Sequence, residues 1–137
     1  MPNKLFVVNL SNFKKRKEMP SIFIVDDDES VCRALKTLLM TYDFDVKTFN
    51  SAQSFFDTVA HDEPGCLLLD IHMPGVDGWE TQKRILTSGS KRAVIFISAE
   101  KLDNAADRAL NVGAVGFLQK PVNAQTLVDL INVSSKN

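Results

Sequence analysis

The 137-residue sequence has little cysteine and no long apolar run. Cys32 and Cys66 are its two cysteines, and neither has a CxxC partner or a metal-ligand spacing, so we predict buried thiols in a reducing compartment rather than a disulfide. No apolar run approaches the roughly 18–20 residues that a membrane-spanning helix needs. The apolar stretch Leu5–Val8 is too short for a signal peptide. These absences exclude a disulfide scaffold and a membrane protein, and we expect a cytoplasmic location.

The chain also lacks a strong charge of either sign, with a formal net charge of −1. Residues 1–20 carry +4, and residues 21–137 carry −5. A mildly acidic body argues against a nucleic-acid-binding surface. The basic run Lys14–Lys17 is typical of a solvated tail. We therefore predict a poorly ordered N-terminal extension over 1–20 and one domain over 21–134, the alternative being that Leu5–Val8 contacts a partner.

From residue 21 onward, strand and helix patterns alternate five times. Short apolar runs predict strands at 22–25, 44–49, 66–69, 93–97 and 115–118. Continuous apolar strands separated by helices indicate a parallel sheet that is covered on both faces. We therefore predict an α/β fold, a (βα)5 doubly wound five-stranded parallel sheet with the flavodoxin-like order 2-1-3-4-5. The run at 44–49 alternates more than the others, which favours an edge strand.

Capping residues and apolar spacing predict where the helices begin and which faces they bury. Asp28, Ser51 and Asn123 each precede a helical pattern and are expected N-caps, and Gly113 is expected to end the fourth helix. The apolar spacing in that fourth helix predicts a buried face made of Leu102, Ala105, Ala106, Ala109 and Leu110.

Polar side chains stand where the predicted strands end. Asp26–Asp28 follow the first strand, Asp70 the third, Ser98 the fourth and Lys120 the fifth. Because strands one and three are neighbours in this order, their carboxylates should converge at the edge of the sheet where such folds bind ligands. Converging carboxylates repel unless a cation joins them, and oxygen ligands without histidine or cysteine favour Mg²⁺ or Mn²⁺. With a hydroxyl and an ammonium group nearby, the set suits phosphoryl transfer to a carboxylate.

Each of these residues also has a purely structural interpretation. Asp26–Asp28 can serve only as a helix cap, Asp70 as a turn former, Ser98 as the cap of the next helix and Lys120 as a surface lysine. Singly, these interpretations are favoured. Suitable polar groups at four of the five strand ends together favour a site.

Four segments together resemble the receiver domain of two-component response regulators. They are IFIVDDDES at 22–30, LLLDIHMPGVDG at 67–78, VIFISAE at 94–100 and GAVGFLQKPV at 113–122. The resemblance spans residues 21–134 and is specific in the order and spacing of these segments. It implies a CheY-like phosphoprotein of phosphorelay signal transduction, similar to the receivers of two-component transcription factors.

The resemblance implies that Asp70 is the phosphoacceptor. It implies that Mg²⁺ is held by Asp27 directly, by Asp26 largely through water, by Asp70 and by the backbone carbonyl of His72. The side chain of His72 as a metal ligand or phosphotransfer group is the alternative that we disfavour.

The resemblance also implies a switch. Ser98 would bind a phosphoryl oxygen and move on activation, and Phe117 matches the aromatic position whose ring turns inward as it does so. Lys120 would pair with the phosphoryl group, and its bond to the following proline matches the family's cis peptide. His72 and Glu100 occupy positions that tune autodephosphorylation in this family.

Partners follow from the same resemblance. A sensor histidine kinase or a phosphotransfer protein would supply the phosphoryl group, so the domain would catalyse only its own phosphorylation and dephosphorylation. The surface formed by the fourth helix, the fifth strand and the fifth helix, roughly 101–134, would change for a downstream protein, an attached output domain or a second copy in a homodimer. We expect no nucleic-acid or membrane contact by this domain, and either a single-domain regulator or a receiver excised from a larger protein.

Three alternatives remain from the sequence. A small haloacid-dehalogenase-like aspartyl phosphatase would use Asp26 as nucleophile with Asp28 two residues on. A flavodoxin-type flavin binder would need a Ser/Thr-rich phosphate loop after the first strand, where this chain has acids that repel phosphate. A contact module that works without phosphorylation would not need the full set of strand-end groups.

Overall fold

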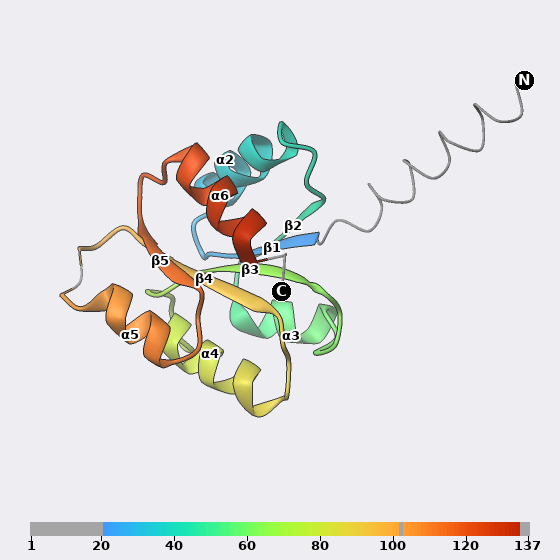
Figure 1. Ribbon diagram of the computed structural model, residues 1–137. Coiled ribbons are helices and arrows are strands. Elements are labelled where there is room, and N and C mark those ends of the chain that lie inside the picture. The colour runs from blue at the N-terminus through green and yellow to red at the C-terminus, as the bar shows by residue number, and fades with distance from the viewer. Residues whose placement is uncertain (1–20, 102, 135–137) are drawn as a thin grey trace, which may run out of the picture.

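The computed structural model describes residues 21–101 and 103–134. Within this part, strands and helices alternate in the order β1 (Ser21–Val25), α2 (Glu29–Met40), β2 (Val46–Phe49), α3 (Ala52–Thr58), β3 (Gly65–Asp70), α4 (Gly78–Thr87), β4 (Ala93–Ser98), α5 (Ala105–Asn111), β5 (Gly116–Gln119) and α6 (Ala124–Ser134) (Figure 1). The extension expected at 1–20 and the buried position expected for Leu102 lie outside the described residues and stay predictions.

All the strand pairs are parallel, and the strand order is β2-β1-β3-β4-β5. This confirms the predicted doubly wound sheet of order 2-1-3-4-5. β2 lies at one edge, as its alternating pattern predicted. β1 and β3 pair in register from Ser21 opposite Gly65 to Val25 opposite Leu69. Their carboxyl ends therefore stand side by side.

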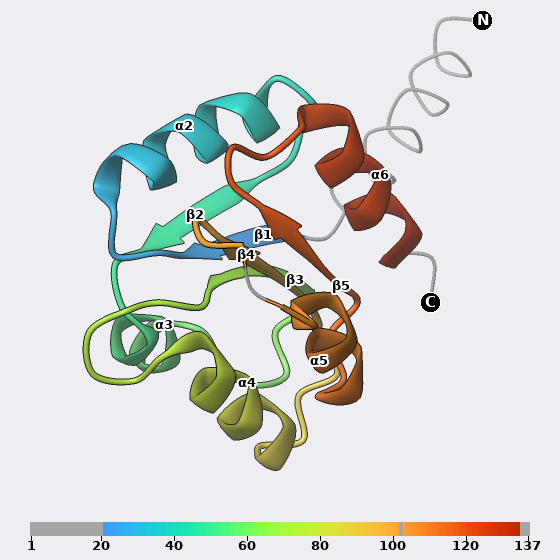
Figure 2. The same cartoon turned by 90° about the vertical axis from the view of Figure 1, so that its left-hand side faces the viewer.

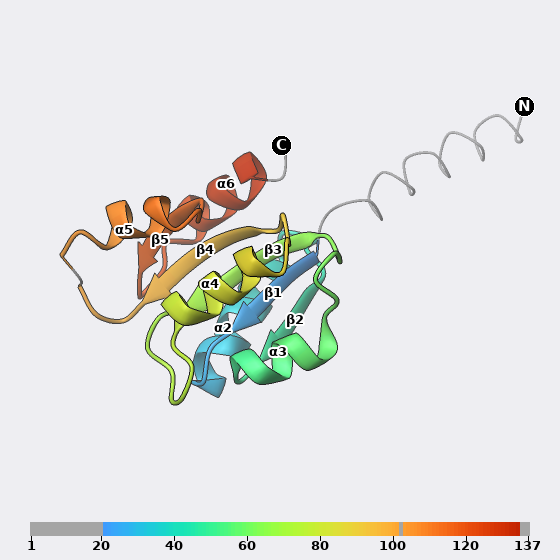
Figure 3. The ribbon, with the colours of Figure 1, turned by 90° about the horizontal axis from the view of Figure 1, so that it is seen from below.

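Helices cover both faces of the sheet. α2 and α6 lie on one face, and α3, α4 and α5 lie on the other (Figure 2). Because side chains alternate along a strand, Ile22 and Ile24 point into the core under α2 and α6, whereas Phe23 and Val25 point into the core under the other three helices. Figure 3 views the sheet from the second face, with α4 in front of the strands. The three central strands, β1, β3 and β4, are thus buried on both sides, which fixes their carboxyl ends in place.

Side-chain caps begin α2, α3 and α6 at the residues that the sequence predicted. Asp28 Oδ1 accepts hydrogen bonds from the backbone of Ser30 and Val31, at 2.9 and 3.4 Å. Ser51 Oγ accepts from the Ser54 amide at 3.1 Å, and Asn123 Oδ1 accepts from the Thr126 amide at 2.9 Å. These bonds satisfy amide groups that a helix start leaves without an intrahelical partner.

The predicted buried face of the fourth helix, α5, is wrong in part. Ala105 and Ala109 are buried, but Ala106 is exposed and the Leu110 side chain is 57% exposed. The seven-residue helix covers one edge of the sheet, so it buries only the narrow stripe formed by residues four apart. Gly113 ends the segment as expected, with a φ of +84° that suits glycine.

The cysteine prediction is confirmed: Cys32 and Cys66 are buried free thiols. Burial raises the pKa of Cys66 to about 12 and that of Cys32 to about 11, so both stay protonated and unreactive. Among the described residues, no helix has the length and apolar character that crossing a membrane requires.

Candidate functional site

The polar residues identified from the sequence meet at the carboxyl edge of the sheet. Asp26 directly follows β1, Asp70 and Ser98 are the last residues of β3 and β4, and Lys120 directly follows β5. Backbone hydrogen bonds hold two of these ends to their neighbours: the Asp26 amide donates to Phe49 O at 3.1 Å, and the Lys120 amide donates to Ser98 O at 2.7 Å. The positions of these groups are therefore set by the sheet itself.

Three carboxylates form one acidic cluster. Asp26, Asp27 and Asp70 each place an oxygen within 4.8 Å of the others. Asp26 is fully buried and Asp70 is 4% exposed, whereas Asp27 is exposed at the rim. Oxygen donors of this kind, open to solvent on one side, fit a hard divalent cation that keeps some of its water. The donor set therefore fits Mg²⁺ or Mn²⁺.

Lys120 faces this cluster from β5. Its Nζ lies 2.6 Å from Asp26 Oδ2 and 3.5 Å from Asp70 Oδ1. Burial by itself lowers the pKa of Lys120, but the hydrogen bond to Asp26 and the charges of Asp26 and Asp70 outweigh burial, so the pKa lies above its usual value. The ammonium group is therefore charged at neutral pH and offsets part of the carboxylate repulsion.

The pKa of Asp70 is raised by its place in this cluster. Burial and the neighbouring charge of Asp26 raise the pKa of Asp70 to about 6, and Lys120 limits the rise. At pH 7 the carboxylate is therefore mostly ionised. A buried carboxylate with few hydrogen bonds is available as a nucleophile.

Asp26 is engaged on both side-chain oxygens. Oδ1 accepts a hydrogen bond from the Asp28 amide at 2.9 Å, and Oδ2 accepts from Lys120. The Asp26 carbonyl also accepts from Cys32 Sγ at 3.3 Å. A fully buried carboxylate with both oxygens occupied is poorly placed to attack a substrate, which argues against the phosphatase interpretation.

The rim of the site carries contacts that the sequence did not reveal. Ser98 Oγ accepts a hydrogen bond from the Glu100 amide at 3.2 Å. His72 Nε2 lies 3.3 Å from Glu100 Oε2, and both side chains are exposed. The two residues expected to tune dephosphorylation thus touch each other beside Ser98.

Phe117 lies on β5 opposite Phe96 of β4 and is partly buried against the core under α3, α4 and α5. Its position beside the strand that ends in Ser98 suits the expected switch. The peptide bond between Lys120 and Pro121 is cis, which agrees with the family pattern.

Gly78 adjoins the site, although in the sequence it stood out only as the last residue of the LLLDIHMPGVDG segment. A Cβ atom at this position would lie 2.4 Å from the carbonyl oxygen of Asp70, which no other residue tolerates. The Gly78 amide donates to Ile71 O at 2.8 Å. The start of α4 is therefore pressed against the backbone of Asp70, and the Asp77-Gly78 pair was the only signal of it.

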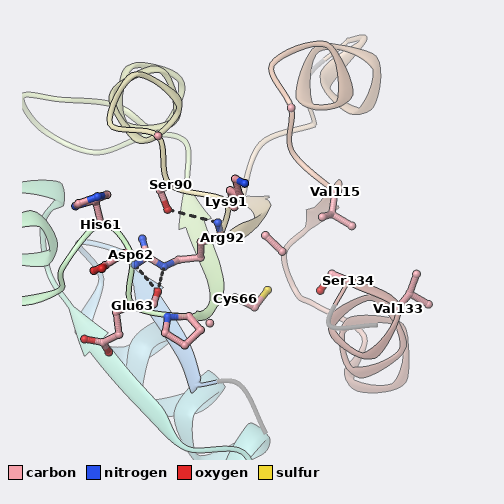
Figure 4. A pocket seen from close by; sticks show the side chains of 15 residues that line it. His61, Asp62, Glu63, Cys66, Ser90, Lys91, Arg92, Val115, Val133 and Ser134 are labelled. Carbon is pink, nitrogen blue, oxygen red and sulfur yellow. Dashed lines mark hydrogen bonds between the residues drawn. The ribbon is translucent and has the colours of Figure 1, made fainter. Parts of the chain in front are cut away.

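A separate cavity of about 800 Å³ lies at the amino ends of the strands, around the start of β3 and β4 (Figure 4). There the Arg92 side chain donates to Glu63 O at 2.7 Å and to Ala60 O at 2.8 Å. The Arg92 guanidinium also lies 5.3 Å from the ring centres of Phe23 and Phe55. These contacts explain Arg92 as a structural bridge, far from the carboxylate cluster.

The family model described as the response regulator receiver domain matches residues 22–132. The chain belongs to this family. Receivers are signalling modules rather than classical enzymes, and the match places the chain in two-component signalling.

Relatives of this receiver include the transcriptional regulatory protein TdiR of Thauera aromatica, 38% identical over 83% of this chain and 50% of that protein. The response regulator protein TodT of Pseudomonas putida is 35% identical over 84% of this chain and 51% of that protein. Among solved structures, response regulator StyR is 37% identical with a TM-score of 0.78, over 85% of this chain and 59% of that one. FixJ-N is 28% identical with a TM-score of 0.75, over 86% and 94%.

The receiver spans about half the length of the curated relatives that it matches. It is thus a receiver of the kind found in two-component transcription regulators. The family match displaces the flavin-binder and phosphatase interpretations.

Proposed function

We propose that this receiver accepts one phosphoryl group on Asp70 from a phosphohistidine of a sensor kinase or phosphotransfer protein. The observation that carries the proposal is the convergence of Asp26, Asp27 and Asp70 at one sheet edge, with the Lys120 ammonium between two of them. Its two free buried thiols suit a cytoplasmic location. Within the chain we assign the receiver to residues 21–134.

The donor set supports a divalent cation in this reaction. Asp27, Asp26 and Asp70 would hold Mg²⁺ or Mn²⁺ together with the backbone carbonyl of His72. When bound, the cation would supply positive charge to oxygens of the transferring phosphoryl group.

The protein groups have complementary tasks in the transfer. An Asp70 oxygen forms the new O–P bond in line with the P–N bond that breaks, and the imidazole leaves with that electron pair and a proton from solvent. Lys120 neutralises charge on the phosphoryl oxygens, and the Ser98 hydroxyl donates a hydrogen bond to one of them. Asp26, held by the Asp28 amide, keeps the ammonium group in place.

The output surface in this proposal is the α5–β5–α6 face, made of Ala105–Asn111, Gly116–Gln119 and Ala124–Ser134. Leu110 and Val133 are 57% and 60% exposed there. An open cavity of about 520 Å³ between these elements is lined by Leu110, Phe117, Leu130 and Val133, among others. Such an apolar surface suits a protein contact, either an output domain or a second copy of the receiver. Movement of Ser98 and Phe117 would reshape it.

Hydrogen exchange with and without beryllofluoride and Mg²⁺ tests this switch. We expect slower or faster amide exchange within 101–122 in the wild-type protein, and no response in Asp70→Asn. If beryllofluoride with Mg²⁺ changed the exchange of neither the wild-type protein nor Asp70→Asn, a contact module that works without phosphorylation would be the better account. Exchange in α3 serves as the internal reference, because this helix lies away from the proposed output face.

A further inference from the structure

One face of α4 contacts α5 at three successive positions. Trp79, Gln82 and Leu86 are spaced three and four residues apart, so they lie on the same side of the helix. Each of them touches α5 or the turn that follows it. α4 and α5 lie beside each other on the same face of the sheet (Figures 2 and 3).

The first contact joins Trp79 to Arg108. The Arg108 guanidinium lies 4.1 Å from the centre of the Trp79 ring, within the range of a cation–π interaction. The Trp79 ring in turn lies 4.5 Å from the ring of Phe96 in β4. Arg108 is therefore held on a ring that the sheet itself fixes.

The second contact joins Gln82 to the end of α5. Gln82 is 1% exposed, and its Nε2 donates to Val112 O at 2.9 Å. Its Oε1 is buried without a hydrogen-bond partner among the described residues. The Gln82 side chain is therefore held to the end of α5 through its amide nitrogen.

The third contact lies at Gly113, where a Cβ atom would meet the Leu86 side chain at 3.5 Å. The carboxyl end of α5 and the turn after it are therefore fixed to α4 along this whole face. We call Trp79, Gln82, Arg108 and the Val112 carbonyl the α4–α5 clamp.

The amino end of α5 lacks comparable support. Asn104, which precedes the helix, has a φ of +60°, a left-handed conformation that costs free energy for a residue with a Cβ. Within the described part of the chain, no side chain caps this helix start with a hydrogen bond. The end of α5 nearer to Ser98 is thus the weaker one.

α4 is fixed at the end that faces the site. Gly78, next to Trp79, is pressed against the Asp70 carbonyl, and Asp77 Oδ1 caps α4 by accepting from the Glu80 amide at 2.9 Å. The clamp therefore connects the backbone of Asp70 to a helix that is secured at one end only.

We infer that the α4–α5 clamp holds α5 in its unphosphorylated position and sets how readily the receiver switches. Arg108 and Gln82 act as positioning residues, because neither touches Asp70. The inference rests on the proposed function for its regulatory consequence. Any contact made only in one of two conformations biases the equilibrium by its own free energy, and the ligand of the other conformation must overcome that bias.

The test compares Arg108→Ala with Arg84→Ala. Both remove one positive charge, and Arg84 only approaches Glu80 on the exposed side of α4, at 3.9 Å. We expect amides 105–112 of Arg108→Ala to exchange about fivefold faster than wild type without ligand. We also expect the apparent affinity for beryllofluoride with Mg²⁺ to rise by about three- to fivefold. Gln82→Leu, which removes the bond to Val112, should likewise speed exchange of these amides and raise the affinity for beryllofluoride.

Two results would overturn the inference. Exchange of 105–112 in Arg108→Ala and Gln82→Leu equal to that of Arg84→Ala would mean that the clamp does not hold α5. Faster exchange with unchanged beryllofluoride affinity would make the clamp structural only. If wild type fails to bind beryllofluoride, the proposed function fails, and faster exchange in the unliganded variants would still establish the clamp.

Discussion

The ammonium nitrogen of Lys120 lies 2.6 Å from a carboxylate oxygen of Asp26, although the two residues are 94 positions apart in the sequence. Asp26 is fully buried, and the Lys120 side chain is 16% exposed. This pair joins the first and last strands of the site and places the ammonium group beside Asp70. It is both a structural element and the part of the site that limits the carboxylate repulsion.

Replacing Lys120 should therefore cost stability as well as activity. Lys120→Ala leaves Asp26 buried without its cation, and we expect the free energy of unfolding without Mg²⁺ to fall by about 2–4 kcal/mol. Urea unfolding measures this, with Lys36→Ala on the exposed side of α2 as the charge-matched control. Added Mg²⁺ should restore part of the loss. A change in Lys120→Ala no larger than in the control would mean that the ion pair has little net value.

The ionisation of Asp70 should destabilise the protein at neutral pH. Its pKa in the folded protein is about 6, above the ordinary value of 3.8, so the stabilising contribution is complete below pH 3.8 and is lost as pH rises through 6. Asp70→Asn should consequently exceed wild type in free energy of unfolding by about 1–2 kcal/mol at pH 7, and match it near pH 4. Urea unfolding at several pH values checks this. The control is Asp57→Asn, an exposed residue paired with Gln53; equal pH profiles for both variants would contradict the expected acidity.

Ser98 should transmit the switch without being the acceptor. Ser98→Ala removes the hydroxyl that accepts from the Glu100 amide and that we assign to a phosphoryl oxygen. We expect this variant still to gain a phosphoryl group, but to lose most of the exchange response within 101–122. Ser98→Thr, which keeps the hydroxyl, should retain the response. A full response in Ser98→Ala would remove this residue from the switch.

Arg92 should matter for stability alone. Its guanidinium donates to two backbone carbonyls and stacks near two phenylalanine rings, and burial lowers its pKa. Arg92→Ala should lower the free energy of unfolding by about 2 kcal/mol and leave phosphoryl acceptance intact. The exposed neighbour variant Lys91→Ala should change neither. A specific loss of phosphorylation in folded Arg92→Ala would point to an unrecognised connection with the site.

The strand-end site could be predicted from the sequence because both of its determinants are local. Apolar runs located the strands, and polar residues followed them directly, so a parallel sheet had to bring Asp26, Asp70, Ser98 and Lys120 to one edge. The caps Asp28, Ser51 and Asn123 were equally local, since each acts on amides two or three residues away.

The remaining contacts depend on how helices and loops pack against one another. Nothing in the local pattern distinguished Leu110 from Ala109, yet one is exposed and the other is buried. The stacking of Arg108 on Trp79 and the reach of Arg92 to the loop at Glu63 join residues 29 apart in the sequence. Pairs of this kind carry no periodic signal, so only the structure reveals them.

The most direct test of Asp70 as the phosphoacceptor is the intact mass of the protein after treatment with acetyl phosphate, with and without Mg²⁺. We expect wild type to gain one phosphoryl group only when Mg²⁺ is present, and Asp70→Asn to gain none. Asp57→Asn should behave as wild type. A phosphoryl group on Asp70→Asn would contradict the assignment and return attention to Asp26. Wild type that stays unmodified and also fails to bind beryllofluoride would contradict phosphoryl acceptance altogether.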